Sequence, residues 1–439
     1  MFLKVYKTII IILALPLSAG AQTVFRSLED VWKYADVHNI TIRTAKYELD
    51  KSKYATKQSY SALLPQVNGT ASFTDNIQLP VTILPAGIIP GNKGGPVAFG
   101  EQFAYAAGIS AQMNILNLQN WYNAKMAKQT EDMNKDSLAG TRKSVYQQLA
   151  TQYYGYLLMQ EAARLADETV SIADSVYQST DNKFKEGTLN EANVDISKLN
   201  LERAQQTQIS AQYQMLTARN NLKALLGFSL RDSLVIQATL QADMNTEAIG
   251  VFTEDPTLRL ASWRVKINQT QYKITNSAFL PSINVLYNYA GQRYDKTFEP
   301  FDGATGVAGW YPGQYWSLQA SIPLFSSGSR LYQSKRSKLN YIESMEQYDN
   351  AHLQSEINDE NIKLSYQKAV AVLSKAKDVM NLSFDNYQHI SYRYEGGIES
   401  IESRLNAFKD YIDYQNQYLN SLSDMLVQLY QVKIREQSF

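Results

Sequence analysis

Apolar and polar residues alternate strictly in four stretches of the chain, arranged as two pairs. The first pair covers 66–75 and 103–115, and the second covers 282–292 and 314–324. A period of two is typical of a β-strand whose two faces meet different surroundings. We therefore predict four strands of about ten residues, which is the length that crosses a bilayer at a tilt.

Proline-free runs with helical periodicity follow each pair of strands. They predict long helices over about 117–186 and 327–396, each of roughly 105 Å. After a turn at a glycine, return helices are expected over 188–226 and 398–436. In the first long helix, apolar positions are separated by alternating steps of four and three, as in a coiled coil. These positions are Val145, Leu149, Tyr153, Tyr156, Met159, Ala163, Ala166, Val170, Ala173 and Tyr177.

A shorter helix is predicted before each pair of strands, over about 27–63 and 256–279. Pro65 and Pro281 follow these helices, and proline disfavours the α conformation for the residue before it. The surrounding letters nearly repeat, since SALLPQVNGTASF begins at Ser61 and SAFLPSINVLYNY begins 216 residues later.

A second near-repeat lies 210 residues apart, in Phe184–Gly187 and Tyr394–Gly397. Two tandem copies of one unit, about 23–227 and 250–439, explain both matches. An irregular linker over 228–255 would join them. Chance similarity between amphipathic helices is the alternative interpretation.

The first residues have the features of an export signal. Lys4 and Lys7 precede an apolar core, Ile9–Leu17, and Ala19-Gly20-Ala21 offers a cleavage site. We therefore expect residues 1–21 to be a signal peptide and 22–439 to be one mature protomer. No later run of 18 or more apolar residues occurs, so a membrane could be crossed only by a closed barrel.

Composition excludes several functions. Basic and acidic residues balance at 42 each, which gives no sign of a nucleic-acid partner. The chain has no cysteine and three isolated histidines, so we expect neither disulfides nor a metal site. No cofactor motif, acid–base pair or catalytic triad is recognisable, and we expect no cofactor and no enzyme activity. The glycine-rich stretch 87–95 lacks P-loop spacing and is expected to be a plain flexible loop.

The strands are too few to close a barrel alone. One face of each strand carries apolar and aromatic residues and the other carries uncharged polar residues, as in a barrel with lipid outside and water inside. Known barrels begin at about eight strands, so the chain must assemble. Three copies give 12 strands and 12 helical positions, and a hollow helical bundle would extend the bore by about 100 Å. A β-sandwich with one buried face is the alternative.

The order of several motifs resembles that of the TolC-like outer-membrane efflux proteins, over essentially the whole mature chain. These motifs are Ser27-Leu-Glu-Asp-Val-Trp-Lys-Tyr-Ala35 followed by Asn39, the two SA(L/F)LP strand entries, Phe184-x-x-Gly187, Ala218-Arg-Asn-Asn-Leu-Lys-Ala-Leu-Leu-Gly227 and Tyr394-x-x-Gly397. The resemblance implies a mainly α protein with a small β part. Its trimer would form a 12-stranded β-barrel continuous with a 12-helix α-barrel tunnel.

The resemblance also implies a function and partners. The homotrimer would sit in outer-membrane lipid and dock onto a periplasmic membrane-fusion adaptor and an inner-membrane transporter. It would conduct substrates passively, for efflux or for type I secretion, and the glycine-rich loops 79–91 and 301–309 would lie outside the cell. A periplasm-spanning coiled-coil scaffold without a pore is the alternative.

The resemblance places the periplasmic entrance and gate at the helix–turn–helix tips. The candidate residues are Phe184, Glu186, Gly187, Glu191, Asp195, Tyr394, Glu395, Gly397, Glu399 and Glu402. Three positions depart from the family pattern, because Glu399 replaces an arginine, and Ser403 and Asn406 replace aspartates. Our hypothesis is that the tip carboxylates form a cation-attracting mouth. The alternative is that they are solvated acids that favour a helix N-terminus.

Overall fold

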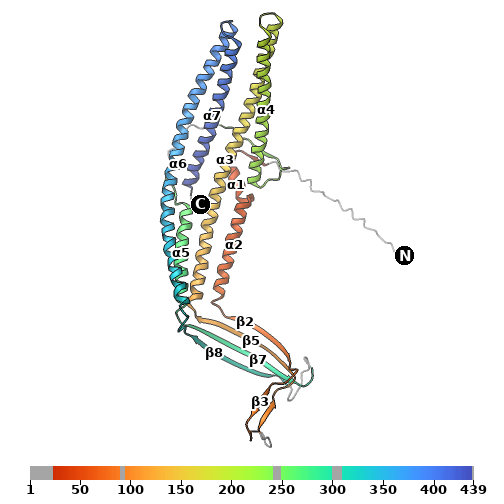
Figure 1. Cartoon of the computed structure of the whole chain (residues 1–439), viewed down its shortest axis with the longest axis vertical. Helices are drawn as coiled ribbons and strands as arrows, with labels where there is room; N and C mark the ends of the chain where they lie inside the picture. Colours follow the sequence, from red (N-terminus) through yellow and green to blue (C-terminus); the bar gives the residue numbers. More distant parts are fainter. Residues whose placement is uncertain (1–22, 89–93, 241–248, 299–308, 438–439) are drawn as a thin grey trace, which may run out of the picture. The chain divides into compact units, whose positions relative to one another are not determined.

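The chain is mainly helical and divides into two compact units (Figure 1). The computed structural model describes residues 23–88, 94–240, 249–298 and 309–437, so the expected signal peptide lies outside the described residues. What we call the tip unit comprises the residues up to Tyr47, Ser137–Pro256 and Leu353 onward. The sheet unit comprises Glu48–Asp136 and Thr257–His352. Among the described helices, none is both long enough and apolar enough to span a membrane.

Apart from α1, the helices occur in pairs of equal or nearly equal length. They are α1 (Leu28–His38), α2 (Ile40–Ser61), α3 (Leu118–Lys185), α4 (Glu191–Leu226), α5 (Pro256–Ser277), α6 (Ser329–Glu395) and α7 (Ile401–Glu436). Helices α2 and α5 each have 22 residues, and α4 and α7 each have 36. The long helices α3 and α6 have 68 and 67 residues. The tandem-repeat interpretation predicts such matched lengths.

The predicted helix over 27–63 is wrong in one respect, because it breaks at Asn39. The Asn39 side chain is buried, accepts a hydrogen bond from the Ile42 amide at 3.0 Å and donates one to the Leu225 carbonyl at 2.6 Å. Its backbone is extended, with ψ at 127°, while its amide still bonds the Ala35 carbonyl. One residue therefore ends α1 and begins α2.

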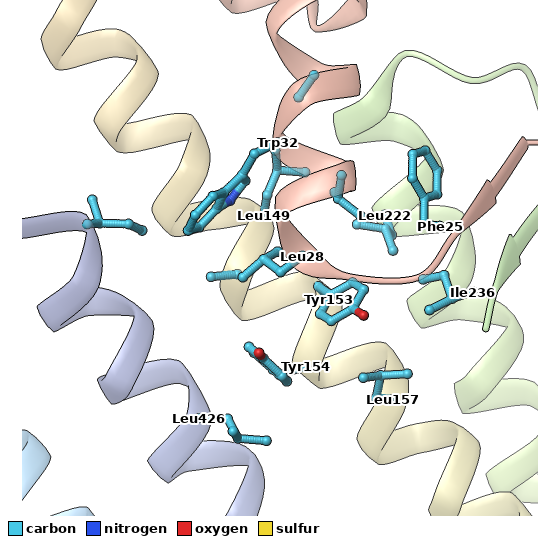
Figure 2. Packing of buried hydrophobic residues seen from close by; sticks show 14 of the residues in the cluster. Phe25, Leu28, Trp32, Leu149, Tyr153, Tyr154, Leu157, Leu222, Ile236 and Leu426 are labelled. Atoms are coloured by element: carbon cyan, nitrogen blue, oxygen red, sulfur yellow. The ribbon is translucent and has the colours of Figure 1, made fainter. Parts of the chain in front are cut away.

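The core of the tip unit lies where α1, α3, α4 and α7 meet. Figure 2 shows Leu28, Trp32, Leu149 and Leu222 among the side chains gathered there, and all four are almost fully buried. The Trp32 ring stacks on Tyr146 with a centroid distance of 4.8 Å, and its indole N–H donates to the Tyr146 carbonyl at 3.2 Å. Because aromatic rings bury large areas, this contact anchors α1 on α3.

The linker over 228–255 is less irregular than predicted. Its residues Leu234–Ile236 form β6, which pairs in parallel with β1 (Thr23–Phe25). The side chains of Leu234 and Ile236 face the core and Val235 lies half-buried between them, so the run Leu-Val-Ile has a strand's alternation and β propensity. Residues 241–248 of the linker lie outside the described residues.

The sheet unit is built on a four-stranded antiparallel sheet in the order β2-β5-β7-β8. Its strands are β2 (Gln66–Asp75), β5 (Phe103–Leu116), β7 (Ser282–Asp295) and β8 (Tyr311–Ser321). Register places Val67, Ala111, Tyr287 and Trp316 in one row, and Asn68, Ser110, Asn288 and Tyr315 in the next. These two neighbouring rows differ in polarity as the sequence predicted, whereas the row of Gln112, Leu286 and Ser317 is mixed.

Several details of the sheet unit differ from the prediction, including the last strand, which begins at Tyr311 rather than at 314. The last strand ends at Ser321 rather than 324, because Pro323 has no N–H for a strand ladder. The third strand continues past 292 to Asp295. The stretch over 79–91 is not only loop, since β3 (Val81–Leu84) pairs with β4 (Gly95–Ala98), and β4 begins at the end of the expected loop 87–95. The residues of Val81–Leu84 favour a strand because Val, Thr and Ile are β-branched.

Candidate functional site

The two tips of the tip unit are helix–turn–helix hairpins with the same backbone geometry (Figure 1). Gly187 and Gly397 have φ angles of 77° and 72°, which glycine adopts without strain. The Gly187 amide bonds the Phe184 carbonyl at 2.8 Å, and the Thr188 amide bonds the Lys183 carbonyl at 2.9 Å.

At the second tip, the Gly397 amide bonds the Tyr394 carbonyl at 3.1 Å, and the Ile398 amide bonds the Arg393 carbonyl at 2.9 Å. These are the two bonds of a Schellman motif in each tip. The near-repeat of four letters in the sequence therefore encodes the same turn twice.

The return helices begin three residues later than predicted, at Glu191 and Ile401. The reason is that each turn ends in a capping residue. Asn190 accepts a hydrogen bond from the Asn193 amide at 3.0 Å, and Ser400 accepts one from the Ser403 amide at 3.0 Å. Ser403, which stands where the resemblance expects an aspartate, takes part in this cap.

Tyr394 is the buried centre of the second tip. Its ring packs with Val176 of α3 and Ile401 of α7, so the two hairpins meet at this point. Lys183 of the first hairpin places its ammonium 4.6 Å from the ring centroid, and the Arg404 guanidinium lies 5.2 Å from it. Both distances are typical of cation–π contacts.

The predicted carboxylates are mostly exposed to solvent. Glu399 is half-buried and forms an ion pair of 3.0 Å with Arg393, which the sequence did not identify. The other five acids are exposed on the two hairpins: Glu186, Glu191, Asp195, Glu395 and Glu402. Phe184 is also exposed, at 40%.

Cations at the tips were missed by the sequence reasoning. Lys183, Arg393 and Arg404 all contact candidate residues. A fourth, Lys185, donates a hydrogen bond to Asp181 at 2.5 Å, and this bond raises the pKa of the amine. Charges of both signs are therefore interleaved at the tips. A possible signal was the presence of Arg393 and Arg404 on either side of the second turn.

A groove of about 880 Å³ runs along the tip unit between the helical hairpins. Residues of α3, α4, α6 and α7 line it, including Ala166, Leu199, Glu402, Arg404 and Asn406. Asn406, the second position where the resemblance expects an aspartate, thus borders this groove. Over the described ranges, no group of three or more His, Asp or Glu residues could hold a metal ion.

A model of the family described as "Outer membrane efflux protein" matches residues 33–228 and 252–432. These ranges include both tips, both long helices and all four strands of the main sheet. The chain belongs to the outer membrane efflux protein family.

Individual relatives have low sequence identity to this chain, but the similarity extends over most of its length. The probable efflux pump outer membrane protein TtgC of Pseudomonas putida is 23% identical over 397 residues, which cover 89% of this chain and 78% of that protein. The antibiotic efflux pump outer membrane protein ArpC, also of Pseudomonas putida, has the same identity and coverage. These relatives are named as efflux pump components and not as enzymes.

Solved structures share the fold. The outer membrane protein VceC of Vibrio cholerae superimposes with a TM-score of 0.75 at 15% identity, covering 92% of this chain and 95% of that one. The open state of the MtrE outer membrane channel of Neisseria gonorrhoeae gives a TM-score of 0.72 at 16% identity, with coverages of 92% and 88%. The predicted class, long helices joined to a small antiparallel sheet, is confirmed.

Proposed function

We propose that three copies of the chain assemble into a channel that conducts substrates passively across the outer membrane. The 12-stranded barrel would continue into a tunnel of 12 helical positions. The observation that carries this proposal is the state of the sheet's two outer strands. All ten residues of β2 and all 11 residues of β8 are exposed, and neither strand has a partner on its outer side within the described residues.

Two open edges cannot persist in lipid. Unpaired backbone N–H and C=O groups in hydrocarbon cost several kcal/mol each, so the edge of β2 must pair with the edge of β8 from another copy. The row with Val67, Tyr287 and Trp316 would then face lipid. The row with Asn68, Ser110 and Asn288 would face a water-filled bore.

Cross-linking across the edges tests the assembly. The chain has no cysteine, so introduced thiols report one contact each. Thr70→Cys is combined, one at a time, with cysteines at Gly313, Tyr315, Ser317 and Gln319, which occupy the polar face of β8. We expect covalent trimers from the pair in register, and from purified trimers a steady conductance in planar bilayers. A rod that remains in aqueous buffer without surfactant would instead support the scaffold alternative.

The tip residues are proposed as the periplasmic entrance. An adaptor and an inner-membrane transporter would deliver substrate there and supply the energy. Small apolar molecules are the favoured cargo over proteins, because relatives are named as toluene and antibiotic efflux proteins.

The carboxylates near the tips would attract cations, although Arg393 already neutralises Glu399. The double variant Glu399→Lys/Glu402→Lys should reduce cation preference in planar bilayers. An unchanged reversal potential would contradict the mouth hypothesis without affecting the channel proposal.

A further inference from the structure

The helix segments that adjoin the sheet contain cations and no carboxylates. Residues 51–65 and 117–130 flank the first strand pair, and residues 264–281 and 322–342 flank the second. No Asp or Glu occurs in any of them, although the whole chain has equal numbers of acids and bases. Their cations are Lys51, Lys53, Lys57, Lys125, Lys128, Arg264, Lys266, Lys273, Arg330, Lys335, Arg336 and Lys338. We call this group the basic collar.

Most cations of the collar lack an anionic partner. Among the described residues, Lys125, Lys273, Lys335, Arg336 and Lys338 are exposed and make no hydrogen bond or ion pair. By contrast, Lys51, Lys53 and Lys128 pair with acids that lie outside the collar segments, such as Glu48, Asp50 and Glu131. The positive charge of the collar is therefore not neutralised within the chain.

Exposed aromatic side chains accompany these cations. Tyr54, Trp121 and Tyr332 are 69%, 56% and 69% exposed. The Lys57 ammonium lies 5.7 Å from the centroid of the Tyr54 ring. Trp121 and Tyr332 each lie one turn into the long helix of their repeat, α3 or α6, so both repeats have an exposed aromatic residue near the start of that helix.

A groove of about 670 Å³ lies within the collar, between α2, α3 and α5. Tyr60, Trp121 and Trp263 line it together with Lys125 and Lys128. Trp263 is held in place by a hydrogen bond from its indole N–H to Asp136 at 2.7 Å. Lys128 remains charged, because hydrogen bonding to Glu131 raises its pKa. The groove thus combines an apolar wall with the Lys125 ammonium and with Lys128, which is paired with Glu131 and with Asp132, an acid that also lines the groove.

We propose that the basic collar binds the headgroups of anionic phospholipids in the inner leaflet of the outer membrane. This inference rests on the proposed function, in which the sheet crosses that membrane and the helices lie in the periplasm. The collar is then at headgroup level, where tryptophan and tyrosine are enriched and where lysine and arginine beside a membrane attract anionic lipid. Acids would be repelled from that surface, which accounts for their absence.

The test uses the full-length protein in detergent, titrated with dioctanoyl phosphatidylglycerol, dioctanoyl phosphatidylcholine or inorganic phosphate. Native mass spectrometry counts bound lipid and gives apparent affinities. We expect a preference for phosphatidylglycerol that falls roughly fivefold per cation removed in Lys335→Gln/Arg336→Gln/Lys338→Gln. Phosphate at equal ionic strength should not compete, because the acyl chains also bind.

A matched control removes the same charge from the tip unit. Lys368→Gln/Lys377→Gln/Lys409→Gln changes three exposed cations that have no ion pair in the described ranges, and it should leave the preference unchanged. Equal binding of both lipids by the native protein would overturn the proposal that the collar binds anionic phospholipids. A second result would also overturn the proposal. If the collar variant changes the ion selectivity of the channel but not its lipid preference, the cations face the bore and not the lipid.

Insertion into pure phosphatidylcholine separates this proposal from the one on which it rests. A native trimer that inserts and conducts there, yet shows no preference for phosphatidylglycerol, refutes lipid binding by the collar and leaves the channel proposal intact. A protein that inserts into neither kind of bilayer refutes the membrane-crossing sheet.

Discussion

The tip unit and the sheet unit differ in how they bury their apolar side chains. In the tip unit, apolar residues such as Leu149, Leu222 and Leu422 are buried against other parts of the same chain. In the sheet unit, residues of the same character, such as Val67 and Trp316, are 66% and 74% exposed. The tip unit therefore contains its own core, whereas in the proposed assembly lipid and neighbouring copies would cover the exposed surfaces of the sheet unit.

Charged groups follow the same division. In the tip unit, Arg435 is 4% exposed and forms a bidentate pair with Asp359, at 2.6 and 2.8 Å. Lys143 and Asp255, both nearly buried, form a second pair at 2.6 Å beside it. The sheet unit has a comparable pair, between Arg293, which is 1% exposed, and Asp295, but most cations of its collar have no such partner within the described residues.

The largest effect is expected where a buried charge loses its partner. Arg435→Ala should lower the free energy of unfolding of the tip unit by about 3–5 kcal/mol, because Asp359 loses its bidentate partner. Chemical denaturation followed by helical circular dichroism measures this. Arg393→Ala removes an exposed pair with Glu399 and should cost less than about 1 kcal/mol. Equal losses in the two variants would show that burial of the pair does not matter.

Truncation of one apolar side chain in each unit tests the contrast directly. Leu149→Ala should cost about 2–5 kcal/mol, because it opens a cavity in a packed core. Val67→Ala truncates a side chain that is 66% exposed, and we expect a loss of less than about 0.5 kcal/mol. Thermal unfolding in detergent compares them. A Val67→Ala loss as large as that of Leu149→Ala would contradict the idea that this exposed apolar row is not packed within the chain.

The junction between α1 and α2 gives a smaller effect. Asn39→Ala removes a cap and leaves the Leu225 carbonyl without its donor, so we expect a loss of about 1–2 kcal/mol. Asn39→Asp keeps the cap to Ile42 but not the donation to Leu225, and it separates the two contributions. Chemical denaturation of the three proteins measures both differences. If both variants unfold like the native chain, the helix break does not depend on this side chain.

The smallest effect is a dependence of stability on alkaline pH. Burial, followed by the nearby Tyr430, raises the pKa of Tyr153 from 10.0 to about 12. The folded state thus holds this proton more tightly than the unfolded state. Its contribution is present below pH 10 and is lost as the pH rises toward 12. Tyr153→Phe should flatten the fall in melting temperature over that interval, whereas Tyr213→Phe, at an exposed position, should not.

The sequence predicted the long elements well because their periodicity is local. It located β2 to the residue and both glycine turns, and most of the predicted α3 stripe is buried, including Val145, Leu149 and Tyr153. It missed Tyr154 and Leu157, which are also buried. Tyr154 packs against Tyr430 of α7, and a helix packed on two sides needs a second apolar stripe that one periodic pattern does not distinguish.

Other misses depend on contacts between distant segments. The break at Asn39 arises from its bond to Leu225, and helical periodicity continues across it. The cations around Tyr394 come from two hairpins, so their meeting depends on how the helices are rotated against each other. The tip acids could be identified in the sequence, but their partners could not. Their role as a mouth stays a prediction.

The pairing of β1 with β6 also constrains the order in which the protein can be completed. Phe25 pairs with Ile236, which is synthesised much later, and Glu29 accepts a hydrogen bond from Tyr430, 401 residues further on. A chain that emerges with its amino end first therefore carries an uncovered apolar face on α1 for most of its passage into the periplasm. Loop closure over such distances is slow, and exposed apolar surface promotes aggregation. The β1–β6 pairing and the Glu29–Tyr430 bond together mean that α1 is fully covered only after the last helix, α7, has reached the periplasm.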